Sequence, residues 1–336
     1  MPFSWTTATR PIVALAPMAG VTDASYRQLI KRIAPEVIVC TEFLSTDAIH
    51  FGAKKTMQMI DFDPSIERPF IVQVFGKDPE HFLTAATIIE QMGADGIDIN
   101  MGCPAAKVVS SCHGSALIRD PDLAAELVHA TVKAVSIPVS VKTRLGWDTA
   151  ETLIPFCQRL VEAGASALAI HGRRYHDKFT GQANWDPIYE LKRAVSVPVI
   201  GNGDIASADD AVAKIENLDG VMVGRGTFGN PWVMREIVDA LCERADASCV
   251  MRSVGTSRRD VPTVAPTSAP RTFAQKIPVI LDHCALAVRI KGEKRGMLEM
   301  RRHLASYVKG FDGASDMRQR LMQVEKLEEA KMILCG

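Results

Sequence analysis

Short apolar runs alternate along the chain with longer segments of helical period. The runs, which predict strands, are residues 12–16, 37–41, 70–75, 96–100, 138–143, 166–171, 197–201 and 219–223. The helical segments between them include 79–92, 121–135, 149–163, 186–195, 208–215 and 231–244. Asp120-Pro121 and Asp186-Pro187 each predict an N-cap followed by a first-turn proline. β-Branched strands between helices are typical of a parallel sheet covered on both faces.

The number of strands separates two α/β architectures. Six strands would favour a doubly wound open sheet, whereas eight strand–helix units favour a closed (β/α)8 TIM barrel. The chain offers eight units between residues 12 and 223, although the stretch 43–69 is irregular. We therefore predict an α/β fold with a (β/α)8 barrel over residues 1–245.

The pattern changes after the last barrel helix. Residues 246–272 are rich in Ser, Thr, Pro and Arg without apolar periodicity, which predicts a linker or an inserted loop. Residues 273–336 return to helical period and predict a small all-α C-terminal domain. Residues 246–336 carry 16 Lys and Arg against 10 Asp and Glu, so positive charge gathers outside the barrel.

Composition excludes several classes of protein. The 336 residues are 47% hydrophobic with a net charge of zero, so a nucleic-acid surface would have to be local. Eight cysteines occur without a Cys-x-x-Cys pair, and the first residues, MPFSWTTATR, lack the apolar core of a signal peptide. No apolar run approaches the roughly 18 residues of a membrane helix. We expect a cytoplasmic protein with reduced thiols and no membrane contact.

Polar residues follow each predicted strand. In chain order they are Met18, Glu42, Gln73, Asn100 with Cys103, Lys142 with Arg144, His171 with Arg173, Asn202 with Asp204, and Arg225. The carboxyl ends of barrel strands meet at one face, where enzymes of this fold place their active sites. The pattern predicts a site there and leaves its reaction open.

Two glycine-rich segments follow the seventh and eighth strands, at the usual phosphate-binding position of this fold. They are VIGNGDI (199–205) and VMVGRGTFGNP (221–231), in which backbone amides and Arg225 would contact phosphate. GRGTFG (224–229) also matches the Rossmann pattern G-x-G-x-x-G. That pattern belongs in the first unit of a Rossmann domain, ahead of another strand, whereas here it closes the last unit.

A phosphate site beside Gln73, Lys142 and His171 is suited to FMN. A lysine near the flavin ring stabilises the negative charge that the ring gains on reduction. Alternatives for Lys142 are an ion pair within the barrel and a Schiff-base nucleophile. His171 on its own is also compatible with a structural role.

Several motifs together resemble the tRNA-dihydrouridine synthases, with the bacterial B group nearest. They are APMAGVTD (16–23), DINMGCPAAKV (98–108), GSALIRDP (114–121), VKTRLGW (141–147), HGR (171–173), IGNGDI (200–205) and MVGRGTFGNPW (222–232). The resemblance implies an FMN enzyme that uses NADPH to reduce a uridine of tRNA to 5,6-dihydrouridine. It covers the barrel and, more loosely, the helical tail.

The resemblance also implies roles for individual residues. Pro17, Met18 and Ala19 would contact the flavin ring, and Gln73, Lys142 and His171 would hold its polar edge and ribityl chain. The ribityl–phosphate end would be bound by Asn202, Gly203, Asp204, Gly224 and Arg225. Asn100, Arg144 and Arg173 would contact the substrate, and Cys103 would donate the proton.

Cys103 lies between a glycine and a proline just after a predicted strand. Its thiol would protonate C5 of uracil while C6 receives the hydride, and a thiol with a pKa of about 8.5 is in the acid form at neutral pH. The alternatives are a structural cysteine, a metal ligand, and a nucleophile activated by His113. No second Cys or His stands at zinc-ligand spacing, so we expect no metal.

Two departures from the family pattern affect the site. Cys112-His113 places a second thiol on the loop that carries Cys103, and Arg174-Tyr175 replaces the usual Thr-Arg after HGR. The tail offers a basic cluster as a phosphate-binding surface, with a solvated helix face as the alternative. Its residues are Arg289, Lys291, Lys294, Arg295, Arg301 and Arg302.

Two other functions remain open at this stage. An FMN barrel that acts on a free pyrimidine, such as a dihydroorotate dehydrogenase, would share the fold and the flavin without needing the basic tail. A non-catalytic RNA-binding protein would not need Cys103, Lys142 and both phosphate loops together.

Overall fold

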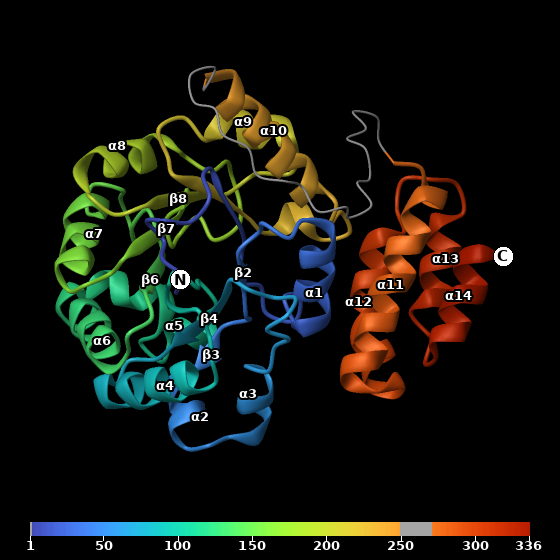
Figure 1. Cartoon of the computed structure of the whole chain (residues 1–336), viewed down its shortest axis with the longest axis horizontal. Helices are drawn as coiled ribbons and strands as arrows, with labels where there is room; N and C mark the ends of the chain where they lie inside the picture. Colours follow the sequence, from blue (N-terminus) through green and yellow to red (C-terminus); the bar gives the residue numbers. More distant parts are fainter. Residues whose placement is uncertain (1, 249–270) are drawn as a thin grey trace.

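The computed structural model describes residues 2–248 and 271–336, which form a parallel barrel and a helical domain beside it (Figure 1). Most of the predicted linker, residues 249–270, lies outside the described residues. The strands are β1 (Ile12–Leu15), β2 (Val39–Cys40), β3 (Leu44–Ser45), β4 (Phe70–Phe75), β5 (Gly96–Met101), β6 (Val139–Arg144), β7 (Ala167–His171), β8 (Val199–Asn202) and β9 (Gly220–Val223).

The strands close into a barrel, as predicted. The sheet runs β1-β9-β8-β7-β6-β5-β4-β2 with every pair parallel, and a bridge between Ala14 and Ile38 joins its two ends. The second unit departs from prediction because its strand is broken: β2 is only two residues long, and the additional β3 pairs with β4.

Helices surround the barrel in chain order (Figure 1). The larger ones are α1 (Ala24–Ile33), α4 (Pro79–Gln91), α6 (Pro121–Ala134), α7 (Leu153–Glu162), α8 (Asp186–Ala194), α9 (Ala208–Lys214) and α10 (Val233–Ser248). Short helices fill the loops: α2 (Thr46–His50), α3 (Lys54–Gln58), α5 (Ala106–Val109), and the 3-10 helices η1 (Gly114–Arg119) and η2 (Arg225–Thr227).

The two predicted N-caps differ in outcome. Asp120 caps α6 as expected, because its carboxylate accepts from the amide of Leu123 over 3.1 Å. Asp186 is instead the first residue of α8, and its own amide donates to Oδ1 of Asn184 over 3.1 Å. The cap prediction for Asp186 was therefore wrong, because an asparagine two residues earlier satisfies this helix end.

Small side chains fill the inside of the barrel. Ala14, Ala16, Ala167 and Ala169 are buried there beside Ile12, Ile71, Ile200 and Met222. Larger aliphatic residues such as Leu15, Val72, Ile99 and Val141 pack between the sheet and the helices. Because these alanine side chains are small, space remains at the carboxyl ends of the strands.

The register of the sheet places the predicted site residues in two neighbouring layers. Asn100 pairs with Lys142 on the next strand, Arg144 pairs with His171, and His171 pairs with Asn202. Four consecutive strands therefore carry polar residues at one end of the barrel, and the layer of Arg144, His171 and Asn202 lies two residues beyond that of Asn100 and Lys142.

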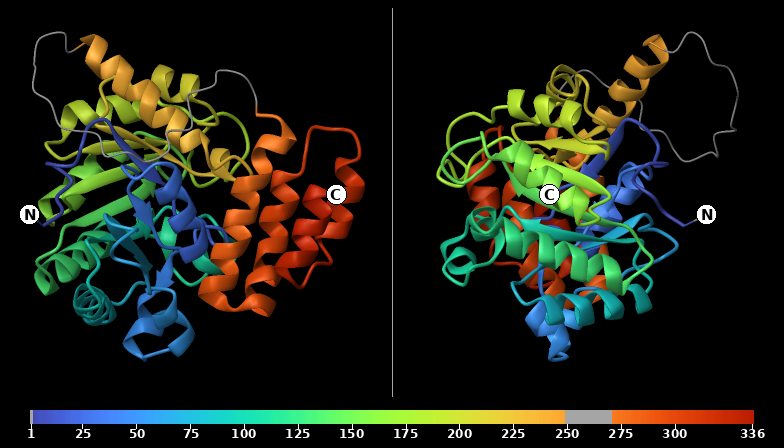
Figure 2. Two further views of the ribbon diagram at one scale, coloured as in Figure 1. Left: turned by 45° about the vertical axis from the view of Figure 1, so that its right-hand side comes forward. Right: turned by 90° about the vertical axis from the view of Figure 1, so that its left-hand side faces the viewer.

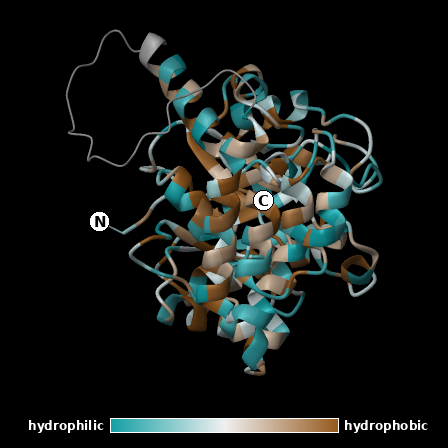
Figure 3. Ribbon diagram, turned by 90° about the vertical axis from the view of Figure 1, so that its right-hand side faces the viewer, coloured by the Kyte–Doolittle hydropathy of each residue, from teal (hydrophilic) through white to brown (hydrophobic). Residues whose placement is uncertain are grey.

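The C-terminal domain consists of α11 (Phe273–Lys291), α12 (Glu293–Tyr307), α13 (Ala314–Leu321) and α14 (Leu327–Cys335). Its core includes Met297, Leu304, Tyr307 and Leu321, and Trp232 of the barrel packs into it. The domain lies against α1 (Figure 2), and hydrophilic and hydrophobic residues alternate along its helices (Figure 3). Among the described residues no helix is long and apolar enough to span a membrane.

Candidate active site

A cavity of about 760 Å³ opens at the carboxyl ends of the barrel strands. It lies among the loops that follow β1, β5, β6, β7, β8 and β9. The predicted residues that line it are Pro17, Met18, Ala19, Asn100, Cys103, Lys142, Arg144, His171, Asn202, Gly203, Asp204, Gly224 and Arg225. The structure thus brings together thirteen of the fifteen predicted site residues around one space.

The other two residues lie behind the cavity wall. Gln73 is fully buried, and Arg173 is 2% exposed. The guanidinium of Arg173 donates to both carboxylate oxygens of Asp204, over 2.8 and 2.7 Å, and to the carbonyl oxygen of Gly181. Direct contacts of Gln73 with FMN and of Arg173 with substrate stay predictions.

Cys103 is held at the cavity by its backbone. Its amide and that of Gly102 both donate to Oδ1 of Asn100, over 2.9 and 3.0 Å. The carbonyl oxygen of Cys103 accepts from the amide of Ser115 over 3.1 Å, which joins the thiol-bearing loop to η1. Burial raises the pKa of the Cys103 thiol, so the protonated form predominates at neutral pH.

His113 is not placed to activate this thiol in the part of the chain that the structure describes. Its ring packs edge-on against Phe75 with centroids 5.6 Å apart, and its Nε2 is buried without a hydrogen-bond partner. Burial lowers the pKa of His113, so no imidazolium stands beside Cys103 to stabilise a thiolate. This geometry favours Cys103 as a proton donor over Cys103 as a nucleophile.

A chain of buried hydrogen bonds continues below Asn100. Nδ2 of Asn100 donates to Oε1 of Gln73 over 2.9 Å, and Nε2 of Gln73 donates to Oδ2 of Asp98 over 2.6 Å. The hydroxyl of Ser140 donates to the other oxygen of Asp98 over 2.7 Å. Asp98 was not among the predicted site residues, although a carboxylate two positions before Asn100 on a buried strand faces the same side of the sheet.

The opposite wall of the cavity is cationic. Lys142 donates to Oδ1 of Asn202 over 3.2 Å, and Nδ2 of Asn202 donates to the carbonyl oxygen of Met222 over 2.7 Å. Burial, together with the neighbouring Arg144, lowers the pKa of Lys142 to about 8. Burial and the cations Lys142 and Arg144 hold the pKa of His171 far below its usual value, so its imidazole is neutral.

Arg144 and Phe179 shape the mouth of the cavity. Arg144 donates to the carbonyl oxygens of Gly102 and Lys178, each over 2.7 Å, which ties the Cys103 loop to the loop after β7. Phe179 on that second loop is 56% exposed, and the guanidinium carbons of Arg144 and Arg225 lie 5.3 and 5.7 Å from its ring centroid. Phe179 was not predicted, because a single aromatic residue in an irregular loop carries no periodic signal.

Glycines after β8 and β9 bring backbone close to the cavity. Gly203 has a φ of +124°, and a Cβ there would lie 2.8 Å from Cβ of Ala183 and 3.1 Å from Cδ2 of His171. A Cβ on Gly224 would lie 3.5 Å from Sδ of Met18. Gly203 therefore leaves space only for backbone, as a phosphate-binding loop requires, whereas a side chain on Gly224 would meet near-ordinary contacts.

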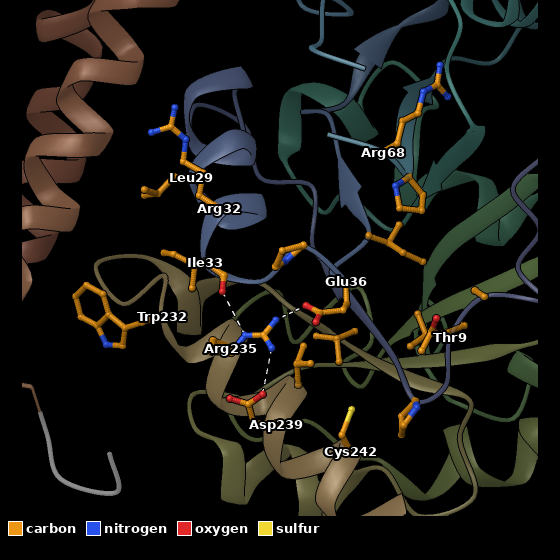
Figure 4. A pocket seen from close by; sticks show the side chains of 18 of the residues that line it. Thr9, Leu29, Arg32, Ile33, Glu36, Arg68, Trp232, Arg235, Asp239 and Cys242 are labelled. Carbon is orange, nitrogen blue, oxygen red and sulfur yellow. Dashed lines mark hydrogen bonds and ion pairs between the residues drawn. The ribbon is translucent and has the colours of Figure 1, made fainter. Parts of the chain in front are cut away.

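A larger cavity of about 1480 Å³ lies at the other end of the barrel, between α1, α10 and α11 (Figure 4). Arg235 on its wall donates to Asp239 over 3.1 Å, to the carbonyl oxygen of Ile33 over 3.2 Å, and to Glu36. Its charges therefore satisfy one another, and the strands point their amino ends toward it. The described residues contain no cluster of three or more His, Cys, Asp or Glu that could hold a metal ion.

One cavity at the carboxyl end of the barrel is lined by the thiol, the cationic wall and the two glycine loops. This is the arrangement of a (β/α)8-barrel enzyme. A solved structure of a 2-naphthoyl-CoA reductase complex has a similar fold, with a TM-score of 0.52 at 12% identity over 68% of this chain and 50% of that one. The family model described as dihydrouridine synthase matches residues 14–335.

Two relatives match over nearly the whole chain. A probable tRNA-dihydrouridine synthase 1 of Synechocystis sp. is 38% identical over 325 residues, which cover 96% of this chain and 85% of that protein. A tRNA-dihydrouridine synthase B of Pseudomonas aeruginosa is 37% identical over 314 residues, covering 93% and 88%. The chain belongs to the dihydrouridine synthase family and is an FMN-dependent oxidoreductase, which confirms the resemblance seen in its motifs.

Proposed function

We propose that this enzyme reduces a uridine of tRNA to 5,6-dihydrouridine, with NADPH as the reductant and Cys103 as the proton donor. The observation that carries the proposal is the thiol of Cys103 on the rim of a cationic cavity of about 760 Å³. The acidic form of the thiol, the neutral His171 and the buried Lys142 are the groups that a reduction of uracil needs. The substrate tRNA implies that the enzyme works in the cytoplasm.

The residues present fit FMN. Gly203, Gly224 and Arg225 offer backbone amides and a guanidinium for its phosphate, and Asn202 and Asp204 offer acceptors for the ribityl hydroxyls. Lys142 would hold the polar edge of the ring, where an ammonium group favours negative charge. Pro17, Met18 and Ala19 provide an apolar wall for the ring. When bound, FMN supplies the hydride that C6 of uracil receives.

Cys103 completes the reduction by giving its thiol proton to C5 of uracil. The bond from sulfur to hydrogen breaks as the bond from C5 to hydrogen forms, and solvent then reprotonates the thiolate. Asn100 holds the backbone of Cys103 and so fixes the distance between thiol and base. The raised pKa of Cys103 keeps its thiol protonated before each turnover.

The target uridine must leave its stack to enter a cavity of this depth. The exposed ring of Phe179 stands at the entrance beside the buried guanidinium of Arg144, and its face can contact a base. We assign tRNA binding to the helical domain, residues 273–336, together with this entrance. Lys294 on α12 is an exposed cation suited to phosphate contact.

The test is mass spectrometry of an unmodified tRNA transcript after incubation with the protein, FMN and NADPH. One uridine should gain the mass of two hydrogen atoms, and fragmentation should locate it. A transcript left unchanged, repeated with tRNA from cells that lack such enzymes, would contradict the proposal. Reduction of free uracil or orotate in place of tRNA would assign the cavity to a small pyrimidine.

A further inference from the structure

The basic cluster of the helical domain is used largely for contacts within the protein. Arg289 donates to Oε1 of Gln28 over 2.7 Å, and Arg301 donates to the carbonyl oxygens of Gln323 and Val324, each over 3.1 Å. Lys291 forms ion pairs with Asp23 and Glu299. Two of these cations, Lys291 and Arg302, reach residues of one barrel loop.

That loop, residues 17–23, follows β1 and contains the wall assigned to the flavin ring. Arg302 donates from Nη1 to the carbonyl oxygen of Gly20 over 3.0 Å, while the amide of Gly20 donates to the carboxylate of Glu42. A Cβ on Gly20 would lie only 2.1 Å from Nη1 of Arg302, and its φ is +70°. The guanidinium therefore packs directly on the backbone of the loop, from the other domain.

The end of the same loop is held by a buried ion pair. Asp23 caps α1 by accepting from the amide of Tyr26 over 2.9 Å, and it pairs with Lys291, whose side chain is 9% exposed. Although burial opposes ionisation, Lys291 holds the pKa of Asp23 well below its usual value. Without Lys291 the carboxylate of Asp23 would lose its cationic partner, whereas Lys291 would still pair with Glu299.

The helical domain also contacts the loop after β9, on the side of the cavity assigned to the phosphate. His303 stacks on Tyr26 with centroids 5.2 Å apart and meets the ring of Phe228 at 5.3 Å. The hydroxyl of Tyr26 donates to the carbonyl oxygen of Thr227 over 2.6 Å. A Cβ on Gly229 would lie 2.3 Å from the carbonyl oxygen of Ser306. One stretch of α12, residues 302–306, thus contacts the loops at both ends of the cavity.

We propose that the helical domain is part of the FMN site and that Arg302 is a positioning residue, which holds the flavin-ring loop through Gly20. The inference rests on the proposed placement of FMN between the two loops. The proposal gives the helical domain a role that does not require tRNA. The loops after β1 and β9 keep the geometry of the cavity because α12 packs against both of them. Removal of the guanidinium frees the carbonyl of Gly20 and loosens Met18 and Ala19 beside the ring.

The experiment compares Arg302→Ala and Arg302→Lys with two controls on the same helix, in full-length protein. Arg301→Ala removes a neighbouring guanidinium that also binds backbone carbonyls but stays within the helical domain. Lys294→Ala removes an exposed cation. Three quantities are measured: the Kd of FMN, the rate at which NADPH bleaches bound flavin without tRNA, and the KM for tRNA.

Arg302→Ala should weaken FMN binding about tenfold and slow bleaching in the absence of tRNA, because the carbonyl of Gly20 loses the guanidinium that holds the loop. Arg302→Lys should recover part of both effects because it keeps a cationic donor. Arg301→Ala should leave both unchanged, and Lys294→Ala should raise only the KM for tRNA. Circular dichroism and the melting temperature of each apoprotein check that the variants are folded.

The inference is overturned if Arg302→Ala binds and reduces FMN like the wild type and loses only tRNA affinity, with a weaker dependence on salt. Arg302 would then be a phosphate ligand. It is equally overturned if Arg301→Ala shows the same FMN defect, since the effect would then come from general damage to the domain. Failure of the wild type to bind FMN or reduce tRNA would instead contradict the proposed function.

Discussion

Gln73 and Asp98 are joined by a hydrogen bond of 2.6 Å that fixes the orientation of every group between Asp98 and Cys103. The donor and acceptor roles along this row of hydrogen bonds are set at the Cys103 end, because the amides of Gly102 and Cys103 can only donate. Asn100 must therefore present Oδ1 to them and Nδ2 to Gln73. Gln73 must then turn Nε2 toward Asp98, whose carboxylate is the acceptor that ends the chain.

Asp98→Ala should lower the rate of tRNA reduction between tenfold and a hundredfold. The substitution leaves Nε2 of Gln73 buried without an acceptor, and loss of a hydrogen bond to a charged group costs about 1.5–3 kcal/mol. The side chain of Gln73 can then rotate away from Nδ2 of Asn100, which leaves the amide that holds the Cys103 loop less firmly oriented. Single-turnover transfer from reduced enzyme to tRNA measures the effect.

Ser140→Ala is the matched control for this prediction. It removes the other hydrogen bond to the same carboxylate and leaves the chain from Gln73 to Cys103 in place. We expect its transfer rate to stay within about threefold of the wild type, the net value of an ordinary hydrogen bond being roughly 0.5–1.5 kcal/mol. Equal rates for Asp98→Ala and the wild type would show that the chain does not position Cys103.

Cys103→Ser should keep bound FMN and lose about a hundredfold or more in turnover. A hydroxyl is a far weaker acid than a thiol, and general acid catalysis contributes about 10²–10⁴-fold. Because burial raises the pKa of Cys103, wild-type activity should decline only in the alkaline range, above the ordinary thiol value of about 8.5. Stopped-flow transfer to tRNA across pH measures both effects.

The exposed Cys112 on the same loop provides the comparison. Cys112→Ala should reduce tRNA at the wild-type rate with the same alkaline limb. Full activity in Cys103→Ser would remove the proton-donor role from Cys103.

Much of the barrel could be predicted because strands buried on both faces carry continuous apolar runs. The strand ends then indicated the site, since parallel strands in a closed barrel meet at one face. The predicted second strand, residues 37–41, contains β2, but the additional β3 was not predicted because it is only two residues long. Asp98 was overlooked as a site residue because its role depends on three partners from different strands, Gln73, Asn100 and Ser140.

The basic tail shows the limit of reading charge from sequence. Arg289, Lys291 and Arg302 form a basic cluster in the sequence, but each contacts a barrel residue in the structure. Which cations face solvent depends on how the helical domain docks on α1, and that geometry is set by long-range packing. A deletion of residues 273–336 would accordingly uncover Tyr26 and the flavin-ring loop, so point variants separate tRNA binding from FMN binding more cleanly.

Phe179→Ala should raise the KM for tRNA about tenfold and leave the Kd of FMN unchanged. Its exposed ring lies at the cavity mouth between Arg144 and Arg225, and stacking of a base on an aromatic ring contributes roughly 1–3 kcal/mol. Phe51→Ala, which removes a ring that is 75% exposed and lies outside the cavity lining, is the control and should behave like the wild type. An unchanged KM in Phe179→Ala would exclude a base contact at this ring.

Lys142→Met should stabilise the apoprotein while abolishing efficient reduction of flavin by NADPH. The folded protein lowers the pKa of this lysine from 10.5 to about 8, so folding works against a charged ammonium at neutral pH. The unfolded chain binds more protons between these two values, and the penalty is therefore full below about pH 8 and fades as the pH rises toward 10.5. Its size is about 3 kcal/mol as an upper estimate.

Thermal unfolding of apoprotein at several pH values tests this prediction. Lys142→Met should melt several degrees above the wild type at pH 7, and the two curves should approach each other above pH 9. Lys192→Met, at a partly exposed lysine paired with Asp219 outside the site, should show no such gain. If Lys142→Met melts below the wild type at pH 7, the buried ammonium is compensated within the apoprotein. Lys142 would then be a structural partner of Asn202 and Asp98. Its role would not be to stabilise negative charge on the bound cofactor.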